Sequence, residues 1–214
     1  MTEQDTAMLT KNTNILRKEV AAHIAADALI KGSYWDAKRG KGCFIGCLTH
    51  SANPAPAFER FGLPVAVLRI AENIFEALPE DKGKAFFAAL PDAVGRDGKD
   101  LSRVHWAFLA AELRALPKTT DAVQAVIDPV IAGMDLLAAG KPWPKDAANA
   151  AANAAADAAN AAAYAAAYAA YAADAAAYAA YAAYAAANAA AAYAANAAAR
   201  LRQRDTLLAL IAAA

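Results

Sequence analysis

The sequence predicts an all-α protein, with a small helical bundle followed by a long Ala-rich helical tail that packs on the bundle or on a second copy. Two observations lead to this prediction. Residues 1–145 alternate turns with stretches that carry apolar residues at helical spacing, and they hold all ten Gly and all nine Pro residues. In residues 146–200, 39 of the 55 residues are Ala, which has the highest helix propensity.

Turn residues and caps place the individual helices. The predicted helices are a first one that includes Ile15 and ends at Gly32, one from Pro64 to Leu78, one from Asp81 to Leu90 stopped by Pro91, one from Ser102 to Leu116, and one from Thr119 or Thr120 towards Ala139 with a kink near Pro129. No convincing run of alternating β-branched and polar residues is present, so no strand is predicted.

The change in composition gives the domain organisation. We expect a mixed-composition helical domain over residues 1–140, a Pro-rich linker over 141–145 and an Ala-rich helical segment over 146–214. The linker contains two consecutive X-Pro steps, which push the backbone away from the α region. Trp143, between the two prolines, is expected to pin the linker to the bundle.

Composition also limits the class of partner and the compartment. The formal net charge is zero, whereas a protein that coats nucleic acid needs clustered excess positive charge. Neither a signal-peptide pattern nor a long run of large apolar residues is present, and the chain has two Cys. We therefore expect a cytoplasmic protein that binds neither a membrane nor a nucleic-acid polymer.

The Ala-rich segment carries a stripe of polar and aromatic residues. Its early non-Ala positions repeat with an eleven-residue period, which keeps them on one face of a helix and leaves bare Ala on the other. The Ala face predicts close packing and a homo-oligomer. The rings of Tyr168, Tyr171 and Tyr178 are candidates for a ligand or protein-partner surface, because Tyr joins an apolar body to a polar hydroxyl.

The segment from Lys31 to Gly42 is the best candidate for ligand binding. It combines Gly residues, cations and adjacent aromatics, and a helical turn or two is expected directly after it, from Cys43 to His50. A Gly-containing loop before a helix presents N–H groups to an anion, and flat rings stack on a base. The predicted ligand-binding residues here are Tyr34, Trp35, Lys38, Arg39, Lys41 and Gly42. The spacing matches neither the P-loop nor the dinucleotide-binding fingerprint. The alternative is a solvated basic loop in which Trp35 is a buried anchor.

Cys43, Cys47 and His50 lie four and three residues apart, so on a helix they share one face. They could begin a zinc site completed by His23 or His105, or Cys47 and His50 could act as nucleophile and base. Buried packing of the two Cys is the third interpretation and the one we expect, because Cys is among the most frequently buried residues. No cofactor, metal ligand or catalytic residue is therefore predicted.

The motifs around this segment resemble those of a group of phage and bacterial proteins. The relevant runs are Gly32-Ser33-Tyr34-Trp35, Lys41 to His50 with its GCxxGCxxH pattern, Phe61 to Pro64, Ile74 to Pro79 and the Ala/Tyr/Asp-rich repeat. The resemblance implies a phage or mobile-element setting, in which small helical proteins often act by binding or blocking.

Three functions follow from these observations. The first is a non-enzymatic protein, such as a phage-encoded anti-defence sponge, that sequesters a small anionic, nucleotide-like ligand. The second is a scaffold, inhibitor or immunity protein that acts through the Tyr/Asn/Asp stripe. The third is a Cys-dependent enzyme.

Overall fold

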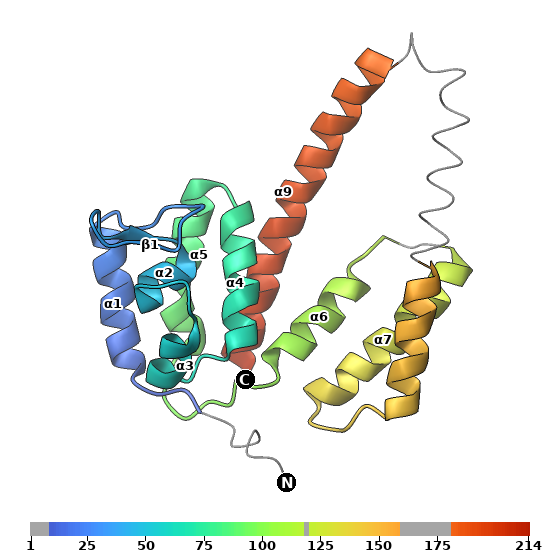
Figure 1. Ribbon diagram of the computed structural model, residues 1–214, viewed down its shortest axis with the longest axis horizontal. Coiled ribbons are helices and arrows are strands. Elements are labelled where there is room, and N and C mark those ends of the chain that lie inside the picture. The colour runs from blue at the N-terminus through green and yellow to red at the C-terminus, as the bar shows by residue number, and fades with distance from the viewer. Residues whose placement is uncertain (1–8, 118–119, 159–180) are drawn as a thin grey trace. The chain divides into compact units, whose positions relative to one another are not determined.

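The computed structural model describes residues 9–117, 120–158 and 181–214, and within the last range it describes side chains from residue 195 onwards. The all-α prediction is confirmed, because helices dominate these ranges (Figure 1). The exceptions in the described ranges are two short strands, β1 (Trp35–Asp36) and β2 (Lys41–Gly42), and a bridge between Leu29 and Gly42.

The chain forms two compact units. Residues up to 108 join with residues 200–214 in the first unit, and residues 109–199 make up the second. The linker predicted at residues 141–145 stays a prediction.

The first unit packs short helices around one apolar core. Helix α1 (Thr13–Ala25) lies against α5 (Glu80–Val94), and α2 (Phe44–Thr49) contacts α1, α3 (Ala55–Phe61) and α4 (Val65–Ala77) (Figure 1). Helix α4 also packs on α5. The short helix α2 is therefore held between longer ones.

Phe44, the first residue of α2, is at the centre of this core. Its side chain is fully buried, and its ring centroid lies 6.1 Å from that of Phe75, 5.2 Å from Phe86 and 5.1 Å from Phe87. These separations fall in the range that aromatic pairs prefer. The cluster fixes the amino end of α2 to α4 and α5.

The first helix is shorter than predicted. It ends at Ala25 rather than at Gly32, because Asp27 adopts a left-handed conformation with φ of 48° and turns the chain. Beyond the turn, the backbone pairs with β2. The Gly42 N–H donates to the Ala28 carbonyl, and the Ile30 N–H donates to the Gly42 carbonyl, both at 2.9 Å. Pairing with a distant strand thus overrides local helical spacing.

Helix α5 is longer than predicted, because it passes through Pro91 and ends at Val94. Proline has no N–H donor, so one intrahelical hydrogen bond is lost, and its ring also crowds the carbonyl of residue i−4. Pro91 is buried in the core, and Gly95, with φ of 76°, follows the end of the helix. The start of α4 after Pro64 and its end before Pro79 agree with prediction.

The second unit begins within α6 (Val104–Arg114) and contains α7 (Asp121–Ala138) and a helical stretch over residues 145–158. Helix α7 has the predicted N-cap, since the Thr120 side chain accepts a hydrogen bond from the Val123 N–H. Trp143 packs on α7 as expected, because a Cβ on Gly133 would lie 2.1 Å from its indole ring.

The end of α9 (Tyr181–Ala213) belongs to the first unit. Leu207 and Ile211 are buried there, so this end of the helix has an apolar, core-facing side. The Lys99 ammonium donates to the carbonyls of Ile211, at 3.2 Å, and Ala212, at 2.7 Å. A cation at this helix end satisfies carbonyls that lack intrahelical partners. The last turns of α9 therefore pack within the first unit.

Replacing Leu207 by Ala tests this packing. We expect the variant to lose about 3 kcal/mol of unfolding free energy, because Leu207 is fully buried and the substitution leaves a cavity. Urea unfolding followed by circular dichroism measures the loss. The Leu210→Ala variant, at a half-buried position of the same helix, is the control and should lose about 1 kcal/mol. Equal losses in both variants would contradict a buried end of α9.

Candidate functional site

The candidate segment folds into a small β-hairpin, which we call the hairpin (residues 34–42). Strands β1 and β2 are antiparallel, with Trp35 opposite Gly42 and Asp36 opposite Lys41. The Asp36 carboxylate accepts hydrogen bonds from the N–H groups of Lys38, at 3.0 Å, and Arg39, at 3.2 Å. The aspartate side chain thereby fixes the hairpin tip (residues 37–40).

The glycines of the GCxxGCxxH pattern let the hairpin cross α2 at close range. A Cβ on Gly46 would lie 1.3 Å from the carbonyl oxygen of Tyr34, and one on Gly42 would lie 2.2 Å from the same atom. The Cys43 N–H donates to the carbonyls of Ser33, at 2.9 Å, and Tyr34, at 3.2 Å. No side chain fits at this crossing, so close packing explains why both positions of the pattern are glycine.

The two cysteines are buried and hydrogen-bonded to the backbone, as the packing interpretation expects. The Cys47 thiol donates to the Gly42 carbonyl at 3.3 Å, and Cys43 Sγ lies 3.8 Å from the Tyr34 carbonyl oxygen. Burial raises the pKa of both thiols to about 12. Both groups are thus protonated at neutral pH, whereas a nucleophilic cysteine needs a lowered pKa.

The structure does not group Cys43, Cys47 and His50 around one point. Helix α2 ends at Thr49, and His50 has a left-handed backbone with φ of 54°, so its ring leaves the face that carries the thiols. The ring stacks instead on Trp35, and it meets His23 from α1. His105, the other proposed completing ligand, lies in α6, where burial lowers its pKa.

Two glutamates of α4 make an acidic pocket behind the hairpin, and sequence reasoning missed them. This pocket, of about 330 Å³, is lined by Gly32, Ser33, Tyr34, Cys43, Glu72, Asn73 and Glu76. Glu72 is 7% exposed, and its carboxylate accepts the Ile45 N–H at 2.8 Å. Glu76 accepts the Gly32 N–H at 3.0 Å. The sequence does contain a sign of this pocket, because two acids four residues apart interrupt the apolar face of this helix.

The acidic pocket changes the electrostatics that the sequence suggested. The Glu72 carboxylate occupies the amino end of α2, where N–H groups were expected to face a phosphate. Burial raises the pKa of the Glu72 carboxyl. Ligand atoms of Cys43, Glu72 and Glu76 lie within 4.8 Å of one another, and each of these groups already has a hydrogen-bond partner.

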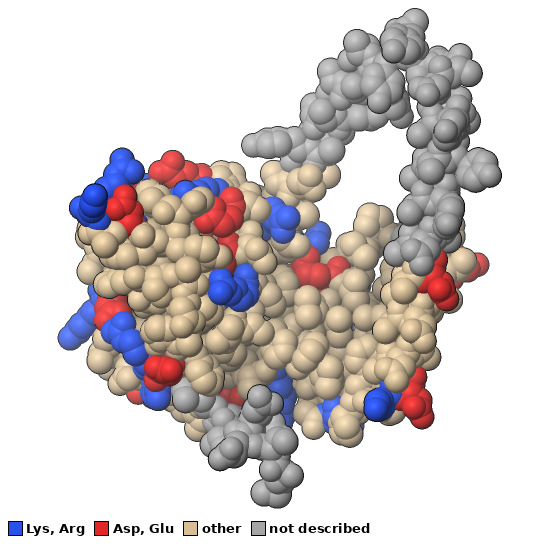
Figure 2. Space-filling model, in the orientation of Figure 1, with Lys and Arg blue, Asp and Glu red and all other residues tan. Residues whose placement is uncertain are grey.

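The predicted cations lie on the outer side of the hairpin. Lys41 forms an ion pair with Asp27 at 3.6 Å, and that carboxylate also binds Lys84 at 2.6 Å. Lys38 and Arg39 are exposed, and neither has an ion-pair partner in the part of the chain that the structure describes. Figure 2 shows basic and acidic side chains side by side at the end of the first unit that carries the hairpin, with further charged side chains along the rest of the visible face.

The two predicted aromatic residues have different surroundings. The Trp35 ring is half-buried and stacks on His50, with ring centroids 4.2 Å apart and planes at 21°. Tyr34 is 42% exposed, and its ring lies 5.9 Å from the guanidinium of Arg69, which also donates to the Tyr34 hydroxyl at 3.3 Å. Tyr34 therefore offers the more accessible ring, and Arg69 is a further cation that the sequence did not indicate.

Tyr168, Tyr171 and Tyr178 lie outside the described residues. The partner surface proposed for them, the homo-oligomer and the compartment stay predictions. None of the helices in the described ranges is long and apolar enough to cross a membrane.

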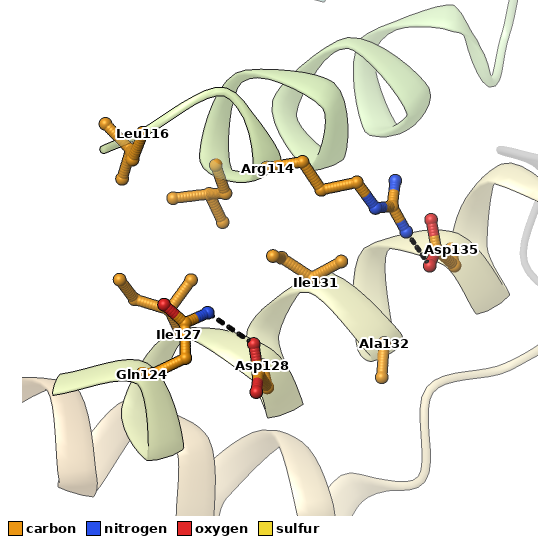
Figure 3. A pocket seen from close by; sticks show the side chains of 9 residues that line it. Arg114, Leu116, Gln124, Ile127, Asp128, Ile131, Ala132 and Asp135 are labelled. Carbon is orange, nitrogen blue, oxygen red and sulfur yellow. Dashed lines mark hydrogen bonds and ion pairs between the residues drawn. The ribbon is translucent and has the colours of Figure 1, made fainter. Parts of the chain in front are cut away.

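The second unit has a pocket of its own, about 410 Å³ in volume, beside α7 (Figure 3). Apolar side chains of Leu113, Leu116, Ile127 and Ile131 line much of it. Its polar groups already pair with one another, since Arg114 binds Asp135 and the Gln124 amide donates to Asp128 (Figure 3). Arg114 and Asp135 neutralise each other, whereas Asp128 keeps its negative charge because its Gln124 partner is a neutral amide.

Comparison with known protein families, curated proteins and solved structures gives no match for this chain.

Substituting Gly46 of α2 and Gly40 of the hairpin tip separates packing from backbone strain. Gly46→Ala places a methyl group inside the Tyr34 carbonyl, so we expect a loss of about 3 kcal/mol in unfolding free energy. Gly40→Ala meets no atom within 4 Å but has φ of 62°, so about 1 kcal/mol should be lost. Urea unfolding compares the two variants, and an equal cost for both would contradict the close crossing.

The thiols give a second test. With pKa values of about 12, only about one thiol in ten thousand is ionised at pH 8. Iodoacetamide should therefore leave Cys43 and Cys47 unmodified in the folded protein, and it should alkylate both in guanidinium chloride. Mass spectrometry counts the adducts. Rapid alkylation of either Cys in the native protein would revive the Cys-dependent enzyme.

Proposed function

We propose that this protein is a non-enzymatic binding protein that holds a small anionic, nucleotide-like ligand at the hairpin. The observation that carries the proposal is the presentation of Lys38 and Arg39 on a tip that Asp36 fixes. Both cations are exposed, and neither is neutralised by a carboxylate among the described residues. Two such adjacent cations suit a phosphate group, because Arg and Lys donate charge-assisted hydrogen bonds to phosphate oxygens.

The rest of the ligand would use the aromatic side of the hairpin. Tyr34 has an exposed ring with the Arg69 guanidinium beside it, so a flat base has a surface for stacking. The phosphates would stay at the tip, because Glu72 and Glu76 repel an anion from the acidic pocket. Tyr34, Lys38 and Arg39 thus form the core of the proposed site.

The thiol chemistry supports binding over turnover. Cys43 and Cys47 are buried and protonated and their thiols face backbone carbonyls, while the His50 ring contacts Trp35 and His23, which supports binding rather than a Cys–His nucleophile and base. The resemblance to phage and bacterial proteins adds a setting in which binding alone would suffice, by withdrawing a signal molecule from its receptor. This proposal retains the sponge hypothesis and assigns the phosphate contacts to the tip.

Native mass spectrometry and a fluorescent ATP analogue test the proposal. Protein purified from its expression host should carry a ligand that is lost on denaturation, or it should bind the analogue in a fluorescence anisotropy titration. The double variant Lys38→Ala/Arg39→Ala should weaken binding at least about tenfold, since each charge-assisted hydrogen bond contributes about 1.5–3 kcal/mol.

The matched control removes two exposed cations elsewhere in the same unit. Lys18→Ala/Lys82→Ala has the same net charge as the tip variant, and it should bind the analogue like the unmodified chain. Equal weakening in both double variants would mean nonspecific electrostatic attraction. A bare native mass together with no binding of the analogue would contradict the proposal.

A further inference from the structure

We infer that His23 and His50 form a binding site for a zinc-type divalent transition-metal ion. The site lies on the Trp35 side of the hairpin, and it uses neither the tip cations nor the thiols. The Nε2 atoms of the two imidazoles face each other at 3.3 Å. They come from different elements, His23 from α1 and His50 from the residue that follows α2.

The separation of the two nitrogens fits a shared metal ion. Zinc–nitrogen bonds are about 2.0–2.1 Å long, so two imidazole ligands at a tetrahedral angle place their nitrogens about 3.3 Å apart. The distance in the structure equals this edge. Imidazole nitrogen is a preferred ligand of Zn²⁺, Cu²⁺ and Ni²⁺, which fixes the class of ion.

The hydrogen bonding of His23 prepares its Nε2 atom for a metal. Its Nδ1 lies 2.8 Å from the carbonyl oxygen of Glu19. A carbonyl only accepts, so Nδ1 carries the proton, and in the neutral ring Nε2 has a free lone pair. A backbone carbonyl that holds the distal ring nitrogen is the usual support of a metal-binding histidine. The Glu19 side chain binds Arg60 and so does not compete for the ring.

His50 is held in place by contacts of its own. Its N–H donates to the Gly46 carbonyl at 2.8 Å, and its backbone has φ of 54°, which turns the side chain out of the helical path. The ring stacks on Trp35, while His23 meets the same indole edge-on, with ring centroids 6.1 Å apart. Two protein ligands leave positions on the ion for water, so we expect micromolar rather than tighter affinity.

The competing explanation is a hydrogen bond between the two imidazoles, with His50 as the donor. That arrangement requires no metal, so metal binding distinguishes the two. Zn²⁺ titration of the full-length, tag-free protein by isothermal calorimetry should give one ion per chain. Trp35 adds a second readout, because Cu²⁺ bound to His50 should quench its fluorescence, and the quenching should disappear in Trp35→Phe.

His23→Gln and His50→Gln should each weaken Zn²⁺ binding at least about tenfold, with circular dichroism showing that both variants remain folded. His105→Gln is the matched control, and it should bind Zn²⁺ like the unmodified protein. Cys43→Ser should also retain binding, which separates this site from the group formed by Cys43, Glu72 and Glu76. No Zn²⁺ binding in the submillimolar range, or binding unchanged in both His23→Gln and His50→Gln, would overturn the inference.

Discussion

The close crossing of the hairpin over α2 is the constraint on which the rest of the first unit depends. The Tyr34 carbonyl lies so near Gly42 and Gly46 that neither position has room for a Cβ. This contact places the backbone N–H of Cys43 under two carbonyls of the incoming chain and directs the thiols inward. Phe44 follows at once and enters the aromatic core, so the crossing and the core are positioned together.

Charge is arranged around this crossing in two opposite ways. On the α4 side, the buried Glu72 carboxylate binds the Ile45 N–H, while on the outer side Lys38 and Arg39 face solvent. The folded-state pKa of Glu72 is raised, so this group favours the folded state at low pH. Its contribution is lost as the pH rises from the unfolded-state pKa to the folded-state pKa. At neutral pH the buried Glu72 therefore lowers the stability of the folded state. Its charge also keeps an anion at the hairpin tip and out of the acidic pocket.

The sequence predicts those helix boundaries that are determined by residues close by in the chain. The proline before α4 and the Thr120 cap of α7 act through neighbouring residues, and both are found in the structure. The hairpin was missed because its strands have two residues each, too few for a detectable alternation. Pairing of Ala28 with Gly42 also shortened the first helix, and this contact spans fourteen positions of the chain.

In the candidate site, too, the sequence points to residues of one loop but not to their partners from distant elements. Composition and spacing make Tyr34, Lys38 and Arg39 candidates, because aromatics and cations in a Gly-containing loop are visible along the chain. The partners Arg69, Glu72 and Glu76 come from α4, so no local pattern connects them to the loop. The sequence suggests His23 only as a distant completing ligand of a zinc site. Its pairing with His50 depends on the point where α2 ends, which is set by packing rather than by helical period.

The hairpin divides its two aromatic residues between two different surfaces. Successive side chains of an extended segment point to opposite faces, so Tyr34 meets Arg69 while Trp35 meets His50. A ligand bound beside Tyr34 and a metal ion bound beside Trp35 would therefore not compete for the same atoms. Both surfaces nevertheless share one support, the contact of the Tyr34 carbonyl with Gly46. Damage at that contact should impair both, whereas loss of Lys38 and Arg39 should impair only the first.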